Sequence, residues 1–170
     1  MTVPELLTPR LRLRGFEATD AEAMRRVMAE EGVLRYFPSS EPPSLERVEG
    51  MIGWFQSHWQ QRGYGDWAVE LRATGELMGR CGLLYIQDTA ETEIDFLLGK
   101  PFWGQGFATE AAKAALQYGL EEHNFSGIVG IVHPENLASQ RVLEKLGMRQ
   151  TLRTNYFGMD CFRYELNRNA

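Results

Sequence analysis

The chain has 170 residues and a formal net charge of −5, with charged and apolar residues spread along its whole length. This is enough for one domain with a buried core, and the composition is typical of a globular protein. The acidic balance argues against a general nucleic-acid binder, and no apolar run approaches the roughly 18 residues of a membrane span, so we expect neither nucleic acid nor membrane as a partner.

The cysteines and histidines indicate no metal site. Cys81 and Cys161 lie far apart, each in a strand-like run, so we expect two reduced structural thiols. His58, His123 and His133 lie at ends of expected elements without a second ligand nearby. The first residues, MTVPELLTPRLRLRG, lack the apolar core of a secretory signal. Together these features predict a cytoplasmic protein without a bound metal.

The first predicted elements are a strand and a short helix. Residues 10–14 (RLRLR) alternate like a strand with one buried face. Thr19 and Glu22 form a capping-box pattern, which predicts a helix reaching about Glu30. No repeat, low-complexity tract or long linker interrupts the chain. We therefore expect a single domain over residues 1–170.

A second helix is predicted after the break at 41–44 (EPPS). Ser44 is a plausible N-cap, and Gly63 and Gly65 end the helix. Several apolar residues recur at helical spacing and should face the core. They are Val48, Met51, Ile52, Phe55 and Trp59.

Most of the remaining chain reads as strands. A hairpin-type turn, 73–76 (ATGE), joins two of them. We expect strands at about 66–72, 77–86, 91–98, 127–133, 149–156 and 159–166, and a helix after Pro134. Antiparallel strands that precede a long helix, an apolar strand and a further helix predict the α+β class. We expect a mixed, mostly antiparallel sheet flanked by helices, not a repeated βαβ unit.

The loop before the long helix contains two glycines, in Gly104-Gln105-Gly106. The first N–H groups of a helix lack internal partners and carry the positive end of its dipole, and glycine lets a phosphate reach them. The pair therefore serves either an anion or simply the turn. A Rossmann motif does not fit, because Thr109 stands at the third glycine position, and the Gly-Lys-Ser/Thr of a P-loop is absent.

A second motif lies thirty residues downstream, where Asn136-Leu137-Ala138-Ser139 opens a helix that Leu146-Gly147-Met148 closes. With both motifs in order, the chain resembles the GCN5-related N-acetyltransferase (GNAT) superfamily, and within it the RimJ/RimL-type, ribosomal-protein N-terminal acetyltransferase-like branch. The matching segments are TPRLRLR (8–14), WAVEL (67–71), GELMGRCGL (75–83), EIDFLLGKPFWGQGFATEA (93–111) and HPENLASQRVLEKLGM (133–148). The resemblance implies the acyl-CoA N-acyltransferase fold, with a splayed central pair of strands.

The resemblance also implies acetyl-CoA as the cosubstrate. The pyrophosphate would lie on the backbone of the glycine loop, the pantetheine arm would pair with the splayed strand, and an asparagine amide would hold that arm. The implied residues are Gly104, Gln105, Gly106, Phe107, Ala108, Thr109, Phe96, Leu97, Leu98 and Asn136. Trp103 departs from the family loop, which usually has Arg or Gln at that position.

Transfer to a primary amine requires a base, because a free alkylammonium is mostly protonated at neutral pH. Glu93 is the leading candidate, since members of the branch often carry Glu in this strand. Strand alternation places Asp95 on the same face, so the two carboxylates compete for the role, and both also fit an exposed polar strand face. A backbone N–H of the splayed strand, such as that of Leu97, would stabilise the oxyanion.

The departing thiolate needs a proton. Many relatives use a tyrosine seven residues after the motif asparagine, but Leu143 occupies that position here. Ser139 lies on the same helical face as Asn136 and matches a serine that the branch uses toward the thiolate. Its alternative role is helix capping, since a serine in a first turn satisfies unpaired N–H groups.

The acceptor amine is the least defined part of the sequence. We expect the first two helices and the 86–92 loop to supply its walls, with Phe37, Tyr85 and Asp95 as substrate-binding residues. A protein N-terminus and a small-molecule amine both stay open, as does a monomer or a homodimer. Two other readings of the same fold are a non-catalytic acyl-CoA-binding sensor and an interaction module without the cofactor.

Overall fold

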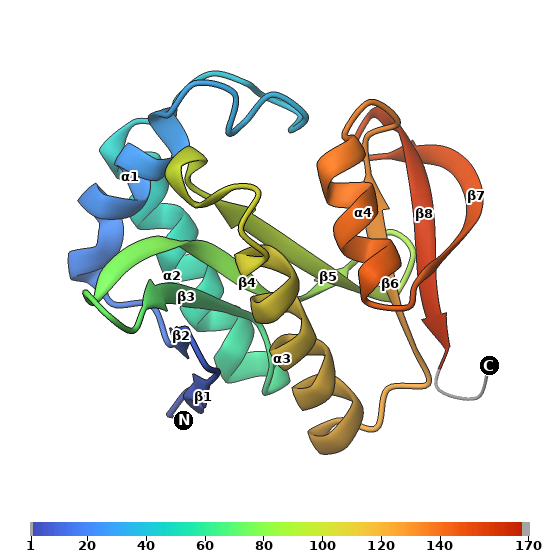
Figure 1. The fold of residues 1–170 in the computed structure, drawn as a ribbon, viewed down its shortest axis with the longest axis horizontal. Helices are drawn as coiled ribbons and strands as arrows, with labels where there is room; N and C mark the ends of the chain where they lie inside the picture. The colour runs from blue at the N-terminus through green and yellow to red at the C-terminus, as the bar shows by residue number, and fades with distance from the viewer. Residues whose placement is uncertain (1, 168–170) are drawn as a thin grey trace.

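The computed structural model describes residues 2–167 and shows one eight-stranded mixed sheet with helices on both faces (Figure 1). Its strands are β1 (Leu6–Leu7), β2 (Leu11–Arg14), β3 (Asp66–Leu71), β4 (Glu76–Ile86), β5 (Glu91–Leu98), β6 (Gly127–Val132), β7 (Arg149–Tyr156) and β8 (Met159–Asn167). Its helices are η1 (Ala18–Asp20), α1 (Ala21–Ala29), α2 (Leu45–Arg62), η2 (Lys100–Phe102), α3 (Phe107–Glu122) and α4 (Leu137–Lys145). The predicted α+β class is confirmed.

The sheet order β1-β2-β3-β4-β5-β6-β8-β7 divides the molecule into two halves. Strands β5 and β6 are parallel, and their register holds one residue pair, Glu93 with Val129. Antiparallel neighbours on either side are paired over much longer stretches. The sheet therefore opens between β5 and β6 beyond Glu93, as the resemblance implied (Figure 1).

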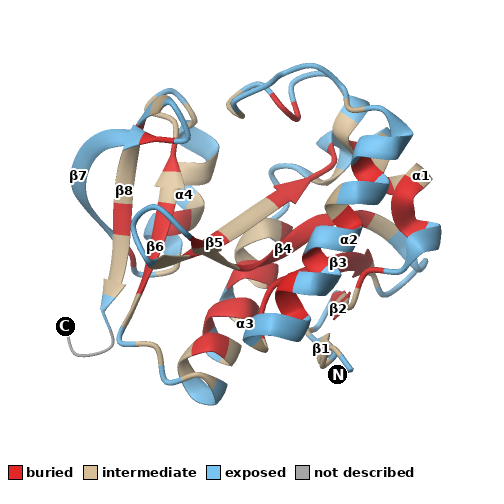
Figure 2. Cartoon of the chain, turned by 180° about the vertical axis from the view of Figure 1, so that it is seen from behind, coloured by how far each residue is buried: buried red, intermediate tan, exposed pale blue. Residues whose placement is uncertain are grey.

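The helices cover the two faces of the sheet with different side chains. Helix α3 approaches closely because Ala111, Ala112 and Ala115 are fully buried against the sheet. A Cβ at Gly119 would lie 2.5 Å from Leu83 Cδ1, so a larger residue there would force the Leu83 side chain to move. Helices α1 and α2 cover the opposite face (Figure 2). None of the helices between residues 2 and 167 is long and apolar enough to cross a membrane.

Helix α2 follows its predicted limits. The Ser44 side chain accepts a hydrogen bond from Arg47 N at 3.3 Å, and Gly63 ends the helix with φ of 75°. Of the predicted core-facing residues, four are buried and Met51 is half-buried. The predicted strands and the 73–76 turn are also confirmed. The two-residue β1 was missed because such a short segment has no detectable alternation.

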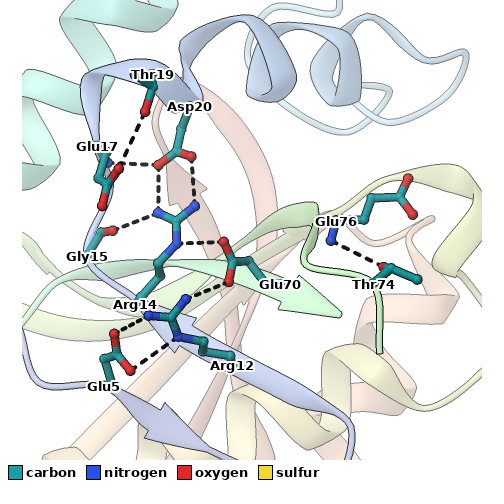
Figure 3. Close-up of polar contacts among 10 residues, drawn as sticks. All are labelled: Glu5, Arg12, Arg14, Gly15, Glu17, Thr19, Asp20, Glu70, Thr74 and Glu76. Atoms are coloured by element: carbon teal, nitrogen blue, oxygen red, sulfur yellow. Dashed lines mark hydrogen bonds and ion pairs between the residues drawn. The ribbon is translucent and has the colours of Figure 1, made fainter. Parts of the chain in front are cut away.

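The predicted capping box at Thr19 and Glu22 is wrong. The chain first makes the 3₁₀ turn η1, in which Asp20 Oδ2 accepts the Glu17 N–H at 2.8 Å. Thr19 instead places its hydroxyl 3.5 Å from a Glu17 carboxylate oxygen (Figure 3). The capping carboxylate is shifted because Arg14, from the neighbouring strand, binds both oxygens of Asp20 at 2.8 Å.

The RLRLR segment divides its side chains between core and surface, as alternation predicts. Leu11 and Leu13 are fully buried. Arg12 and Arg14 point to the opposite face, where both bind Glu70 of β3, at 3.2 and 2.6 Å (Figure 3). This ion-pair network ties β2, β3 and η1 together.

Candidate active site

The glycine loop presents backbone to solvent at the start of α3. Gly104 and Gly106 have φ of 71° and 81°, and Gly106 is the N-cap of the helix. Side chains are strained at such angles, whereas a Cβ at Gly104 would meet nothing within 4 Å. The glycines thus serve backbone conformation, not crowding. The same conformation leaves an open N-terminus that fits a phosphate.

An arginine from the connection between β1 and β2 supports this loop. Arg10 donates to the Gln105 carbonyl at 2.9 Å and to Glu110 of α3 at 2.7 Å. Thr8 also binds Glu110, at 2.6 Å. The contacts join residues about a hundred positions apart, so sequence reasoning missed them. Because Arg10 pairs with Glu110, the negative charge of Glu110 in the first turn of α3 is compensated beside the anion site.

The open side of β5 is defined by its hydrogen bonding to β4. Gly99 N donates to Met78 O at 2.8 Å, and the β4–β5 register runs without a shift. Backbone groups alternate in direction along a strand, so those of Leu97 also point toward β4. The groups of Phe96 and Leu98 point toward the opening, where the Trp103 indole N–H occupies the Leu98 carbonyl at 2.8 Å. The sequence-based choice of the Leu97 N–H for the oxyanion is therefore wrong.

A cleft of about 310 Å³ lies where β5 and β6 separate. Its walls include Phe96 of β5, His133 at the end of β6, and Asn136 and Ser139 at the start of α4. Asn136 is the N-cap of α4, since its Oδ1 accepts the Ser139 N–H at 3.2 Å. Capping is thus performed by Asn136, which leaves the Ser139 hydroxyl for other partners.

Glu93 lies at the base of the cleft. The residue is 8% exposed, and its Oε2 has no hydrogen-bond partner among the described residues. Burial raises the pKa of Glu93 to about 8, although the nearby Arg80 opposes the shift. A carboxylate with such a pKa can accept a proton near neutral pH, whereas an ordinary carboxylate is too weak a base.

Asp95 lies on the same strand face but has a different partner. Its carboxylate forms an ion pair with Arg80 of β4, which also binds the fully buried Asp66 of β3 at 2.6 Å. Asp95 is therefore less available as a base than Glu93. Sequence reasoning missed Arg80 and Asp66. The detectable signal was Arg80 within the apolar part of β4, together with Asp66 at the start of β3.

A second cavity of about 270 Å³, the side pocket, is also lined by Glu93. Cleft and pocket share Leu84, Glu93 and Phe157. The pocket is further lined by Trp54, Tyr85, Ile86, Gln87 and Asp88. Among the predicted substrate-binding residues, Tyr85 lines the pocket, whereas Phe37 and Asp95 line the cleft. Phe157, in the β7–β8 turn, was not predicted.

The two thiols lie near these carboxylates. Cys81 and Cys161 are both buried and free, and Cys161 forms part of the cleft wall. Burial raises the pKa of each thiol, which keeps it protonated. Within residues 2–167 no group of three His, Cys, Asp or Glu side chains has the arrangement of a metal site.

Comparison with known proteins assigns the family. Residues 10–149 match the model of the acetyltransferase (GNAT) domain. The chain is 34% identical to "Uncharacterized protein YkkB" and 32% identical to "Uncharacterized N-acetyltransferase YoaA", both of Bacillus subtilis. These alignments cover 85% and 86% of this chain and 84% of each relative. A solved acetyltransferase from Agrobacterium tumefaciens superposes with a TM-score of 0.85 at 28% identity, over 99% of this chain and 96% of that one. The protein is an acetyltransferase and belongs to the GNAT family.

Proposed function

We propose that this acetyltransferase transfers the acetyl group of acetyl-CoA to a primary amine by direct attack, in the manner of the RimJ/RimL-type branch. The observation that carries the proposal is Glu93, buried and unpaired where the cleft and the side pocket meet. A donor in the cleft and an acceptor in the pocket would come together at this carboxylate. A sensor or interaction module has no need of a basic carboxylate at that junction.

The residues of the cleft fit the cosubstrate. The exposed loop 104–106 and the first N–H groups of α3 suit the pyrophosphate. The outward groups of Phe96 and the outward N–H of Leu98 suit the amides of the pantetheine arm, since Trp103 already binds the Leu98 carbonyl. Asn136 uses its side-chain oxygen as a cap, so its NH₂ group is left to donate to the same arm. Leu97 contributes its side chain to the core, and Phe107 anchors the first turn of α3.

The reaction needs two proton movements. As the amine nitrogen bonds to the acetyl carbon, Glu93 accepts the nitrogen's proton. The outward N–H of Phe96 or Leu98 stabilises the oxyanion. When the carbon–sulfur bond breaks, the Ser139 hydroxyl protonates or hydrogen-bonds the thiolate. Asp95 forms an ion pair with Arg80 and so holds the positive charge of Arg80 near the reacting groups. Asp95 is not itself the base.

The oligomeric state and the cellular compartment are predicted from the sequence alone. A monomer or homodimer in the cytoplasm is consistent with the acidic charge and two free thiols. Both stay predictions.

The proposal is tested by following CoA release with a panel of primary amines, together with acetyl-CoA binding by calorimetry. Gly106→Val should raise the acetyl-CoA dissociation constant at least tenfold, about 1.4 kcal/mol, because valine is strained at φ of 81° and blocks the open backbone. Gly75→Val is the matched control, since Gly75 has φ of 74° in the distant β3–β4 turn. Acetyl-CoA binding without transfer to any amine would favour the sensor.

A further inference from the structure

We infer that the side pocket selects primary amines whose nitrogen carries a compact aromatic or branched aliphatic group. The inference rests on the proposed function, because it takes Glu93 as the point where the amine meets the acetyl group. With nitrogen at Glu93, the remainder of the acceptor must extend away from the cleft. The side pocket is a second cavity that Glu93 lines, and its volume of about 270 Å³ suits a compact group.

The walls of the side pocket are mainly apolar. Trp54 of α2, Tyr85 and Ile86 of β4, and Phe157 of the β7–β8 turn come from three separate parts of the chain. Two of them, Trp54 and Phe157, are 50% and 55% exposed. Aromatic side chains this exposed contribute little to the core, whereas a bound apolar group would cover them.

Phe157 also occupies an unfavourable backbone position. It has φ of 55° and forms, with Gly158 at φ of 78°, a two-residue connection between β7 and β8. Such turns need positive φ at both positions and prefer Asn-Gly, because a bulky residue in the left-handed region is strained. Neither burial nor backbone geometry favours phenylalanine here, and strain of this kind clusters at ligand sites.

The root of that turn is firmly held beside Glu93. Tyr156 donates its hydroxyl to Glu91 at 2.7 Å, and Arg163 donates to the same carboxylate at 2.7 Å. Glu91 precedes Glu93 by two residues on β5, so the contacts fix the tip of the turn over the reacting end of the pocket. Phe157 is thus a positioned wall and not a loose loop residue.

The wall formed by Trp54 and Tyr85 is equally fixed. The Trp54 ring packs 5.2 Å from the ring of His58, which is buried. His58 is held at both nitrogens, through Nδ1 to Tyr64 O at 2.8 Å and through Nε2, which accepts the Tyr85 N–H at 3.2 Å. The Tyr85 ring carries the Arg62 guanidinium 3.6 Å above its centre. A preformed apolar wall of this kind binds a flat or branched group without ordering cost.

The test uses two matched acceptor pairs at saturating acetyl-CoA. Phenylethylamine and ethanolamine represent free amines, and the peptides Phe-Ala-Ala and Ser-Ala-Ala represent N-terminal amines. Wild type should favour the aromatic member of at least one pair by about tenfold or more in kcat/KM. The pair that shows the preference identifies whether a free amine or a peptide N-terminus supplies the group.

Two variants test the wall directly. Trp54→Ala and Phe157→Asn should each lower this preference about tenfold. Phe157→Asn should also raise Tm, because asparagine tolerates positive φ, so a lost preference cannot be blamed on unfolding. Leu152→Asn is the matched control, since Leu152 lies on the same hairpin, is 45% exposed and lines neither cavity.

The outcomes separate the inference from the function on which it rests. Acetyl transfer without preference for the aromatic members, or a preference that survives both variants, overturns the inference and leaves the acetyltransferase intact. An absence of CoA release with every amine, in protein that binds acetyl-CoA, overturns the proposed function and the inference with it.

Discussion

Two clusters of charged side chains in this protein differ in how completely their polar atoms are paired. In the β2–β3 network, Arg12 and Arg14 bind Glu5, Glu70 and Asp20, and each carboxylate has an arginine within 3.2 Å (Figure 3). The cluster around Arg80 is more deeply buried, and fewer of its polar atoms have hydrogen-bond partners. That cation faces three carboxylates, and three buried polar atoms of the cluster lack a partner within residues 2–167, namely Asp66 Oδ1, Arg80 Nε and Glu93 Oε2. Asp95 Oδ2 has only its ion pair with Arg80.

The difference distinguishes a structural network from a reactive one. Buried polar groups are almost always hydrogen-bonded, so several unsatisfied atoms together mark a place where stability is given up. Burial raises the pKa of Glu93. Burial acts in the same direction on Asp20, but its bonds to Arg14 and to the Glu17 N–H together lower the pKa of that carboxyl. A proton-accepting group requires a buried and unpaired carboxyl, as at Glu93. A structural ion pair between neighbouring segments requires a paired carboxylate, as at Asp20.

The largest expected effect is the loss of the base. Glu93→Gln should lower kcat/KM by about 10²–10⁴-fold, because it keeps the shape of the side chain but cannot accept a proton. Glu93 acts only when ionised, so the wild-type rate should rise with pH through about 8. The variant should keep only the titration of the amine, and its defect should reach full size above pH 8. Asp95→Asn is the parallel control in kcat/KM against pH, and a parallel profile for Glu93→Gln would assign the base elsewhere.

The two clusters should also respond to pH with opposite signs. Between an ordinary value of 4.5 and about 8, native Glu93 holds a proton that the unfolded chain has lost, so the free energy of unfolding falls as pH rises. Relative to wild type, Glu93→Gln should therefore gain stability across this range, by as much as about 5 kcal/mol. Asp20 has a lowered pKa, so its contribution is present above about pH 4 and is lost as pH falls. Urea unfolding of wild type, Glu93→Gln and Asp20→Asn at several pH values measures both slopes. A constant difference between wild type and Glu93→Gln would contradict the raised pKa.

Removing the cation of the reactive cluster should destabilise the fold. Arg80→Met leaves Asp66 buried without a counter-charge, which costs about 3–5 kcal/mol in comparable pairs. The double variant Arg80→Met/Asp66→Asn should recover part of this loss, since the two groups interact directly. The double-variant cycle is measured by urea unfolding, and additive losses would show that the pair contributes nothing through its contact.

The smallest effects belong to the β2–β3 network. Arg14→Met should cost about 1–3 kcal/mol, because it leaves Asp20 and Glu70 without their main partner. Arg12→Met, on the same strand face but 41% exposed, should change Tm less, and the change should shrink in high salt. Thermal unfolding at two ionic strengths separates the two arginines. An equal loss for both would mean that burial does not control the strength of this network.

The local elements were readable from the sequence because each has its own short-range signal. Leucine and arginine alternate in residues 10–14, Ser44 and Gly63 bracket a helix, and Gly106 precedes another. These signals depend on neighbours within four residues. The error at Thr19 shows their limit, because the capping carboxylate of Asp20 is held by Arg14, six residues away on β2 and beyond the range of such a signal.

The sequence by itself determined the class of fold, the glycine loop at the start of α3 and the two carboxylates of β5 that compete as base. Only the tertiary structure decided between them, because the choice depends on which carboxylate forms an ion pair with Arg80 of the neighbouring strand β4 and which has a buried oxygen without a partner. The tertiary structure also places Phe157 of the β7–β8 turn and Trp54 of α2 in the walls of the same side pocket. Contacts between residues so distant in the chain arise from the pairing of strands, and a burial-driven pKa exists only once those strands exclude water.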